Sequence, residues 1–270
     1  MGAVSELWSF RGLIANLASR ELRAKYKKSV LGWTWSLVNP LAILLVYTLV
    51  FGVFLGVEPD APAGNGELES FGLFLFAALV MWNFFNAIVT GSMGSLASAG
   101  PLLRKVYFPP ECTVFANVLT AAIQTTAEAL ILAVVMIVVG NVAWTFLLLP
   151  VLLVVLMAFA TGIGLIVSIA NVYYRDVSYL VGIALQILFY ATPIIYPLSL
   201  ADKEVWGIRA LPIIEINPLT QFVQLARDLM YGLQTGSAAR WGYVLVISIA
   251  TLAVGWRVFQ RRAALISEEV

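Results

Sequence analysis

Six long apolar stretches alternate with shorter polar segments along this chain of 270 residues. Each stretch comes close to the roughly 20 apolar residues that an α-helix needs to cross the hydrocarbon core of a bilayer. The pattern predicts an all-α membrane protein with six transmembrane helices. The predicted spans cover residues 33–57, 71–98, 112–139, 144–170, 177–196 and 241–259.

Prolines modify two of these spans. Pro40 lies near the start of the first span and is expected to bend or break that helix after Asn39. Pro193 and Pro197 interrupt the end of the fifth span, which leaves open whether this segment exits the membrane or re-enters it.

The first 30 residues predict a different kind of element. Apolar residues from Leu7 to Leu17 recur at helical spacing, which indicates an amphipathic helix in the cytoplasmic interface of the membrane. The run then becomes basic, with Arg20, Arg23, Lys25, Lys27 and Lys28. Two interpretations stay open: the cations anchor the topology, or they bind the headgroup or diphosphate of an anionic lipid.

The segment from Leu198 to Arg240 is the longest loop, and apolar residues are spread through it. Their spacing is helical from Pro218 to Tyr231. We expect short, half-buried, gate-like helices over the outer mouth, between spans five and six. They either stabilise the bundle as a cap or gate the exit.

Small residues indicate close helix packing in two places. Gly52 and Gly56 form one such pattern, and a small-residue face lies late in the second span. That face consists of Gly91, Gly94, Ser95, Ala97 and Ser98. Neither pattern identifies a dimer interface.

Basic residues predict the orientation, because they concentrate in cytoplasmic loops. One set of loops holds the N-terminal bases, Arg104, Lys105, Arg175, Arg257, Arg261 and Arg262. The first loop of the opposite set, 57–70, has four acids and no base. Both termini are therefore predicted to be cytoplasmic. We predict a single transmembrane domain over residues 1–270, with a cytoplasmic interface segment over 1–30, a six-helix membrane part over 31–262 and a cytoplasmic tail over 263–270.

Composition excludes several kinds of membrane protein. Hydrophobic residues make up 61% of the chain, histidine is absent and one cysteine, Cys112, is present. Glu128 is the one acid deep inside a predicted span. Such a chain lacks the residues for a proton relay, a Ser-His or H-E-x-x-H protease site, or an internal disulfide. It must move something large or be driven by a partner.

Five segments, in order, carry a resemblance to a known family. They are residues 20–35 followed by Pro40, residues 103–109, residues 171–176, residues 190–197, and residues 216–219 with Arg227. Together they resemble the permease subunits of ABC exporters for O-antigen, teichoic acid and related lipid-linked polysaccharides. The Ala- and Val-rich composition is similar to actinobacterial, mycobacterial-type members that export cell-wall galactan.

The resemblance implies a homodimer in the bacterial inner membrane, with two cytoplasmic ATPase subunits beneath it. A polyprenyl-diphosphate glycan would pass between the permease halves, and the partners would include membrane lipid but no nucleic acid. The chain contains no G-x-x-x-x-G-K-[ST] motif. It is therefore predicted to be no enzyme, with no catalytic residue, metal or cofactor of its own, while the partner subunit binds ATP and Mg²⁺.

Two short cytoplasmic segments are candidates for coupling to the ATPase. By the resemblance, the main coupling helix lies between Gly100 and Glu111 and carries Arg104, Lys105, Tyr107 and Phe108. Arg175 and Asp176 would form a smaller contact. A helix cap or a local ion pair is an equal alternative for that pair.

A path for a glycan needs aromatic and polar lining, because sugar rings stack on aromatic faces and hydroxyls need partners. The candidates are Trp82, Phe84, Phe85, Asn86, Glu128, Tyr190 and Tyr196. A position in a lipid-facing belt is the commoner explanation for any one of these aromatics, and a hydrogen bond to a neighbouring helix is the alternative for Glu128.

Two other classes fit the sequence less well. A proton- or sodium-driven carrier is expected to show several intramembrane carboxylates or histidines, and a membrane-embedded transferase or protease needs its own catalytic groups. Within the exporter class, an ABC permease for a drug or a small lipid remains the alternative.

Overall fold

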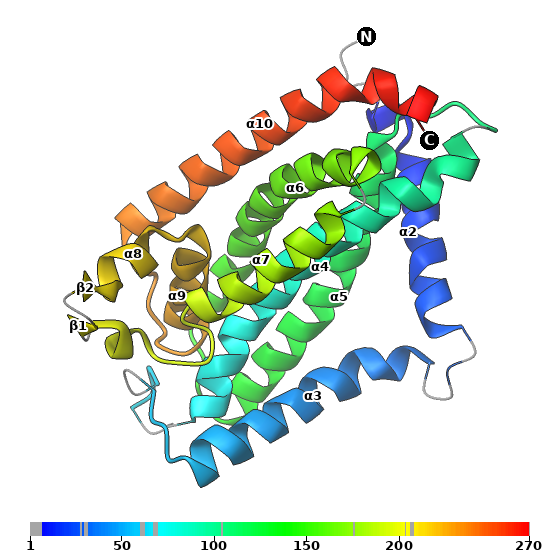
Figure 1. Ribbon diagram of the computed structural model, residues 1–270. Helices are drawn as coiled ribbons and strands as arrows, with labels where there is room; N and C mark the ends of the chain where they lie inside the picture. The colour runs from blue at the N-terminus through cyan, green and yellow to red at the C-terminus, as the bar shows by residue number, and fades with distance from the viewer. Residues whose placement is uncertain are drawn as a thin grey trace.

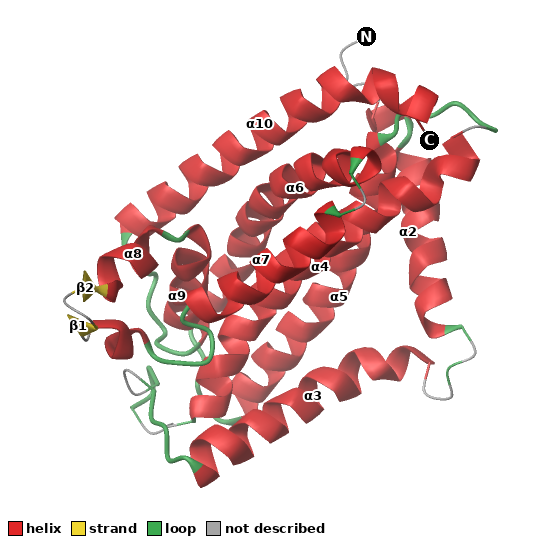
Figure 2. Cartoon of the chain, viewed as in Figure 1, coloured by secondary structure: helices red, strands yellow, loops and turns green. Residues whose placement is uncertain are grey.

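The computed structural model describes residues 7–27, 29, 32–59, 63–66, 70–103, 105–174, 176–202, 204–205 and 208–269. Its α-helices are α2 (Arg11–Tyr26), α3 (Trp35–Tyr47), α4 (Phe71–Leu103), α5 (Glu111–Val138), α6 (Leu149–Tyr173), α7 (Val177–Ala191), α8 (Ala210–Ile216), α9 (Pro218–Met230) and α10 (Ala238–Glu269). A π-helical segment, η2 (Thr48–Phe54), continues α3, and short 3₁₀ turns are η1 (Gly32–Thr34), η3 (Trp144–Leu148) and η4 (Leu198–Asp202). Figure 2 shows that helix dominates the chain.

A small antiparallel hairpin accompanies the helices. Its strands are β1 (Glu204–Val205) and β2 (Ile208–Arg209), and Glu204 pairs with Arg209. With two residues in each strand, the hairpin only closes the connection between η4 and α8.

Four of the six predicted spans are confirmed as helices long and apolar enough to cross a membrane. They are Phe71–Leu102, Glu111–Val138, Trp144–Tyr173 and Ala238–Arg262. The first and fifth predicted spans are shorter apolar helices, Val38–Phe54 and Val177–Ala191. The expected break at Pro40 is absent, because α3 continues through it. Pro40 lies in the first two turns, where the missing N–H removes a single helical bond.

The chain connections gather at two ends of the bundle (Figure 1). The start of α2, the α4–α5 and α6–α7 connections and the end of α10 lie at one end, which we call the inner end. Residues 57–59 and 63–66, the hairpin, α8 and α9 lie at the other, the outer end. This arrangement agrees with the two sets of loops separated by their basic residues.

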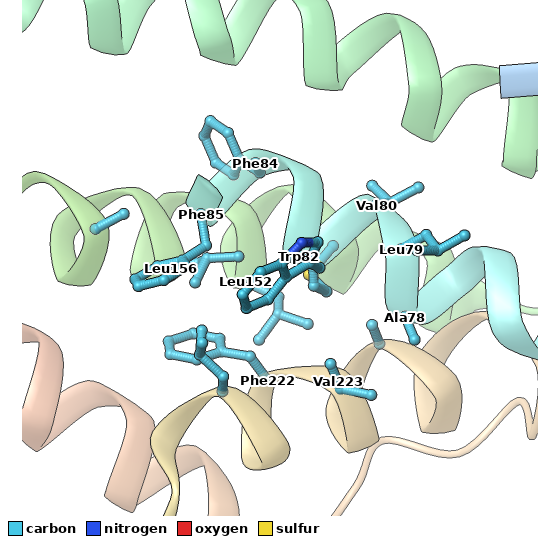
Figure 3. Packing of buried hydrophobic residues seen from close by; sticks show 14 of the residues in the cluster. Ala78, Leu79, Val80, Trp82, Phe84, Phe85, Leu152, Leu156, Phe222 and Val223 are labelled. Atoms are coloured by element: carbon cyan, nitrogen blue, oxygen red, sulfur yellow. The ribbon is translucent and has the colours of Figure 1, made fainter. Parts of the chain in front are cut away.

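Helix α4 is the centre of the fold. Of its apolar window, 83% is buried inside the protein, against 22% to 44% for the other three long helices. It packs against α5, α6 and α9. An apolar helix is stable where other helices or lipid cover it. For α4 the cover is protein, and Figure 3 shows its side chains meeting those of α6 and α9.

Glycines bring some helices into backbone contact. A Cβ at Gly255 of α10 would collide with the carbonyl group of Gly162 on α6. In the same way, a Cβ at Gly91 of α4 would collide with the side-chain amide of Asn117 on α5. These positions require glycine because the facing helix occupies the space of a side chain.

Helix α9 is buried more deeply than the expected half-buried cap. Phe222, Val223, Leu225 and Leu229 are all buried in the main hydrophobic cluster. Figure 3 shows Phe222 and Val223 facing Leu152 and the aromatic side chains of α4. The helical spacing is confirmed, and α9 forms part of the core at the outer end; whether it gates an exit stays open.

Candidate functional site

Helix α2 is attached to α5 by polar side chains. The Nζ of Lys25 donates to Oε1 of Gln124 at 2.9 Å, and the hydroxyl of Thr120 donates to Oε2 of Glu21 at 3.4 Å. Thr120 and Gln124 stand one turn apart, so they meet α2 along one face of α5. The second half of α2 therefore follows α5 from the inner end toward its middle.

A groove lies between α2 and the facing surfaces of α4 and α5; we call it the α2 groove. It consists of two adjoining cavities of about 430 and 440 Å³ that share Glu21, Ala24 and Gly91 as lining residues. Arg20 lines the first and Lys25 the second. Volumes of this size fall within the range of about 300–1,000 Å³ typical of small-molecule sites.

The predicted small-residue face of α4 forms one wall of this groove. Gly91, Gly94, Ser95 and Ser98 all line it. Gly91 packs closely against Asn117, as expected, but a Cβ at Gly94 would meet no heavy atom within 4 Å. The expectation of close packing is therefore wrong for Gly94, where the small side chain leaves open space.

The basic residues predicted to bind a lipid diphosphate separate into two groups. Arg20 and Lys25 face the α2 groove, whereas Arg23 donates to the carbonyl and the hydroxyl of Ser19 on its own helix, at 3.3 and 3.1 Å. Lys27 follows the end of α2 and is exposed. Lys28 lies outside the described residues.

The two candidate coupling segments both lie at the inner end. Tyr107 is 82% exposed and Lys105 is exposed, while Phe108 is 3% exposed and belongs to the protein interior. Only Tyr107 of the aromatic pair is therefore available to a partner. Arg104 lies outside the described residues.

In the second segment, Asp176 is exposed at the start of α7. Its side chain makes no capping hydrogen bond to the described residues, although its backbone carbonyl accepts from Tyr179 and Leu180. The capping alternative is therefore wrong for the carboxylate. Arg175, its predicted partner, lies outside the described residues.

The candidate lining of a conduit falls into buried and exposed groups. Trp82, Phe84 and Phe85 are buried at 8%, 2% and 2% exposure, and their rings pack inside the chain. The ring centroids of Trp82 and Phe189 are 5.2 Å apart, for example. These three side chains have no surface to offer a glycan in this conformation, because α4 is enclosed by its neighbours.

The remaining candidates keep polar or exposed surface. Tyr190 is 58% exposed, and the hydroxyl of Tyr196 donates to its carbonyl at 3.1 Å. Asn86 is partly exposed. Glu128 accepts from Nδ2 of Asn83 at 3.3 Å, which links α5 to α4 and fits the interpretation of a bond between neighbouring helices.

Helix α7 carries a candidate surface of which the sequence interpretation named only Tyr190. Tyr179, Ile183, Gln186 and Tyr190 are exposed at spacings of four, three and four residues, so they share one face. An exposed amide in an apolar helix is costly in lipid unless it meets water or a partner. The helical spacing of these four residues could have indicated a shared face from the sequence. The burial of Leu185 in the structure was needed to show that the opposite side of α7 faces the protein.

Buried polar residues hold the outer end together. Arg227 is 3% exposed, donates to the carbonyls of Phe74 at 3.3 Å and Ile194 at 2.9 Å, and lies over the Phe74 ring at 3.8 Å. Asn141 donates to the carbonyls of Met230 and Tyr231, both at 3.0 Å. These contacts tie α9 to α4, to the turn after α7 and to the α5–α6 connection, so the side chains serve the fold.

Comparison with known proteins gives a consistent result. Residues 13–231 match the family model described as ABC-2 type transporter. The chain is 28% identical over 268 residues to the O-antigen export system permease protein RfbA of Myxococcus xanthus, covering 99% of this chain and 98% of that protein.

Two further relatives support the same family. The O-antigen export system permease protein RfbA of Klebsiella pneumoniae is 26% identical over 80% of this chain and 79% of its own length. The polysialic acid transport protein KpsM of Escherichia coli is 24% identical over 90% of both chains. With four long membrane helices and a family match over most of its length, the chain belongs to the ABC-2 type transporter family.

Proposed function

We propose that this chain is the permease subunit of an ATP-driven exporter that moves a lipid-linked polysaccharide from the cytoplasm across the inner membrane. The observation that carries this proposal is the similarity over nearly the full length to permeases named for O-antigen export. The exposed Tyr and Gln face of α7 supports a sugar as cargo, since aromatic and amide side chains are the usual partners of sugar rings and hydroxyls.

The energy for transport comes from a separate subunit in this proposal. The chain has no P-loop motif, and Tyr107 presents an exposed aromatic side chain at the inner end. Two ATPase subunits would bind there and hydrolyse ATP, one beneath each copy of a permease homodimer. The glycan would pass between the two copies, along faces that include α7.

Six spans with both termini in the cytoplasm remain the topology that we propose. The inner end gathers the basic loops, and the start of α2 and the end of α10 lie there together (Figure 1). The helices of residues 38–54 and 177–191 would cross with help from flanking residues, and α8 and α9 would complete the outer half beside α7.

The polysaccharide itself is proposed at two levels of detail. A polyprenyl-diphosphate glycan is the general substrate, and cell-wall galactan is the particular one suggested by the Ala- and Val-rich composition. A drug or small-lipid exporter is the competing assignment, because the same architecture serves either cargo.

Export in cells tests the function. When the chain is depleted, we expect the lipid-linked glycan to accumulate on the cytoplasmic side and surface polysaccharide to fall. The matched control is a strain whose ATPase partner lacks the P-loop lysine, which should accumulate the same lipid. Normal surface polysaccharide, with a small lipid retained instead, would support the competing assignment.

Cysteine labelling tests the orientation. In a Cys112→Ser background, Glu58→Cys should react with an impermeant thiol reagent added outside, whereas Lys27→Cys should react only after permeabilisation. Glu58 is exposed and therefore suits the test. Gly64, in the same outer loop, does not suit it, because a Cβ there would lie 2.5 Å from the Leu233 side chain. Outside labelling at Lys27 would reverse the proposed topology.

A further inference from the structure

The α2 groove lies in the inner half of the membrane domain in the proposed topology. Its α4 wall runs from Ala87 to Leu102, in the last part of α4, which is rich in Gly and Ser. Its α5 wall runs from Thr113, in the first turn of that helix, to Gln124. The groove therefore extends from the inner ends of α4 and α5, which lie nearest the lipid headgroups in this topology, toward the middle of these helices.

The charges in the groove favour an anion. Arg20 and Lys25 line it together with one acid, Glu21, which leaves a net charge of +1 from 2 − 1. Lys25 is held toward the groove by Gln124. Glu21 lies 3.4 Å from the hydroxyl of Thr120, whose shorter hydrogen bond, at 2.9 Å, goes to the carbonyl of Ala116. Within the described part of the chain, the guanidinium of Arg20 forms no hydrogen bond or ion pair.

The shape of the groove leaves room for a headgroup. Its α4 wall is built from glycines and serines, and the space in front of Gly94 is open. The same wall is filled at Gly91, where Asn117 packs against the backbone and donates to the carbonyl of Ile88 at 3.1 Å. In the part of the chain that the structure describes, the groove is thus bounded by the contact between α4 and α5 on one side and by α2 on the other.

We propose that the α2 groove binds the phosphate groups of a lipid headgroup, and specifically the diphosphate of the lipid-linked substrate, with Arg20 and Lys25 as its cationic ligands. A guanidinium presents paired N–H donors that match phosphate oxygens, and the ammonium adds a second charge. This inference rests on the proposed function for the identity of the lipid. Bilayer phospholipids carry the same phosphate chemistry and are the other source to be distinguished.

Binding to the purified full chain in detergent, followed by native mass spectrometry, tests the site directly. The probes are farnesyl diphosphate, phosphatidylglycerol and, as a neutral match, farnesol. At about a fivefold effect for each cation near a membrane surface, Arg20→Gln with Lys25→Gln should weaken the binding of farnesyl diphosphate about 30-fold. Farnesol should bind wild type and variant equally weakly.

The chain offers a matched control with the same change of charge. Arg23→Gln with Lys27→Gln removes two cations from the same region outside the groove, so binding should change by less than about twofold after screening by salt. Glu21→Gln should act in the opposite direction and strengthen binding about fivefold. Equal losses from both double variants would overturn the site, because they would show only general attraction to a basic helix.

A steric variant separates the site from its charges. Gly94→Leu places a side chain in open space and should abolish binding while the protein stays monodisperse, since leucine also favours helix. Arg20→Gln alone is the control in case the double variant misfolds. The single change should leave the fold intact, because the Arg20 side chain loses no partner among the described residues. Unchanged binding in both Gly94→Leu and Arg20→Gln would overturn the proposal.

The two lipid sources and the proposed function give distinguishable results. Phosphatidylglycerol that binds as tightly as farnesyl diphosphate, with the same dependence on Arg20, would assign the groove to a bilayer lipid and overturn the substrate assignment. If wild type exports polysaccharide and Gly94→Leu exports it at the normal rate, the proposed function stands, and the groove is not a binding site for the exported substrate. Absence of polysaccharide export by wild type would instead remove the proposed function.

Discussion

Two arginines show how differently the ends of this bundle use the same side chain. At the outer end, Arg227 is enclosed and donates to the carbonyls of Phe74 and Ile194. At the inner end, Arg20 is exposed beside the α2 groove. A buried guanidinium must be satisfied by the protein itself, because its desolvation is costly. An exposed guanidinium keeps its donors accessible. The outer end is thus held by internal contacts, and we propose that the inner end contacts partners.

The largest effect should come from removing the buried arginine. Arg227→Ala leaves two buried carbonyls without their charged donor, and each such bond contributes roughly 1.5–3 kcal/mol. We expect the free energy of unfolding to fall by about 3–6 kcal/mol, read as a large drop in melting temperature of the purified protein. Arg20→Ala is the control and should change it by less than about 0.5 kcal/mol. Similar melting temperatures of the two variants would show that Arg227 stabilises the fold no more than Arg20 does.

A second test compares neighbours at the inner end. Phe108→Ala opens a cavity in the interior and should cost about 3 kcal/mol or more of stability, measured by thermal unfolding. Tyr107→Ala should leave stability within about 0.5 kcal/mol of wild type. Instead it should weaken assembly with the ATPase, by roughly 30-fold for an aromatic anchor worth about 2 kcal/mol, measured by co-purification. Full assembly of the Tyr107 variant would place the contact elsewhere.

The smallest effect concerns the surface of the outer end. Burial raises the pKa of Asp228, while its 3.0 Å ion pair with Arg240 opposes that rise. The folded protein therefore holds this proton more tightly than the unfolded chain does. The contribution of Asp228 to stability is fully present below its ordinary pKa of 3.8 and is lost as the pH rises through the higher folded pKa.

Asp228→Asn should flatten this part of the profile of melting temperature against pH. Glu215→Gln, an exposed acid on α8 at the same end, is the control and should leave the slope unchanged. A wild-type profile that rises through the same range, and that Asp228→Asn flattens, would show that the ion pair outweighs the burial.

Much of the fold follows from simple features of the sequence. Long apolar runs predict α4, α5, α6 and α10, because a helix must satisfy its own backbone in lipid. The basic residues also predict which connections share an end of the bundle, because Lys and Arg are in excess in the loops that stay in the cytoplasm. The amphipathic spacing after Pro218 predicts α9 as well. Its depth of burial was not predictable, since spacing shows which face is apolar but not which helices will cover it.

The site was less predictable than the fold. Trp82, Phe84 and Phe85 lie on a helix that is apolar all round, so no pattern distinguishes burial from the lining of a path. Gly91 and Gly94 look alike in the sequence, yet Asn117 fills the space beside one and nothing fills the space beside the other. Arg20 and Arg23 likewise differ only in the direction that α2 gives them, which depends on its contacts with α5.

The short apolar helix α7 has a consequence for the surrounding bilayer in the proposed topology. Residues 177–191 extend about 22 Å at about 1.5 Å per residue, less than the hydrocarbon thickness of about 30 Å. Hydrophobic mismatch of this kind thins the adjacent lipid at a modest cost in free energy. Because α4 is enclosed by its neighbours, we expect membrane thickness to act on this chain through its thin flank at α7 rather than through its centre.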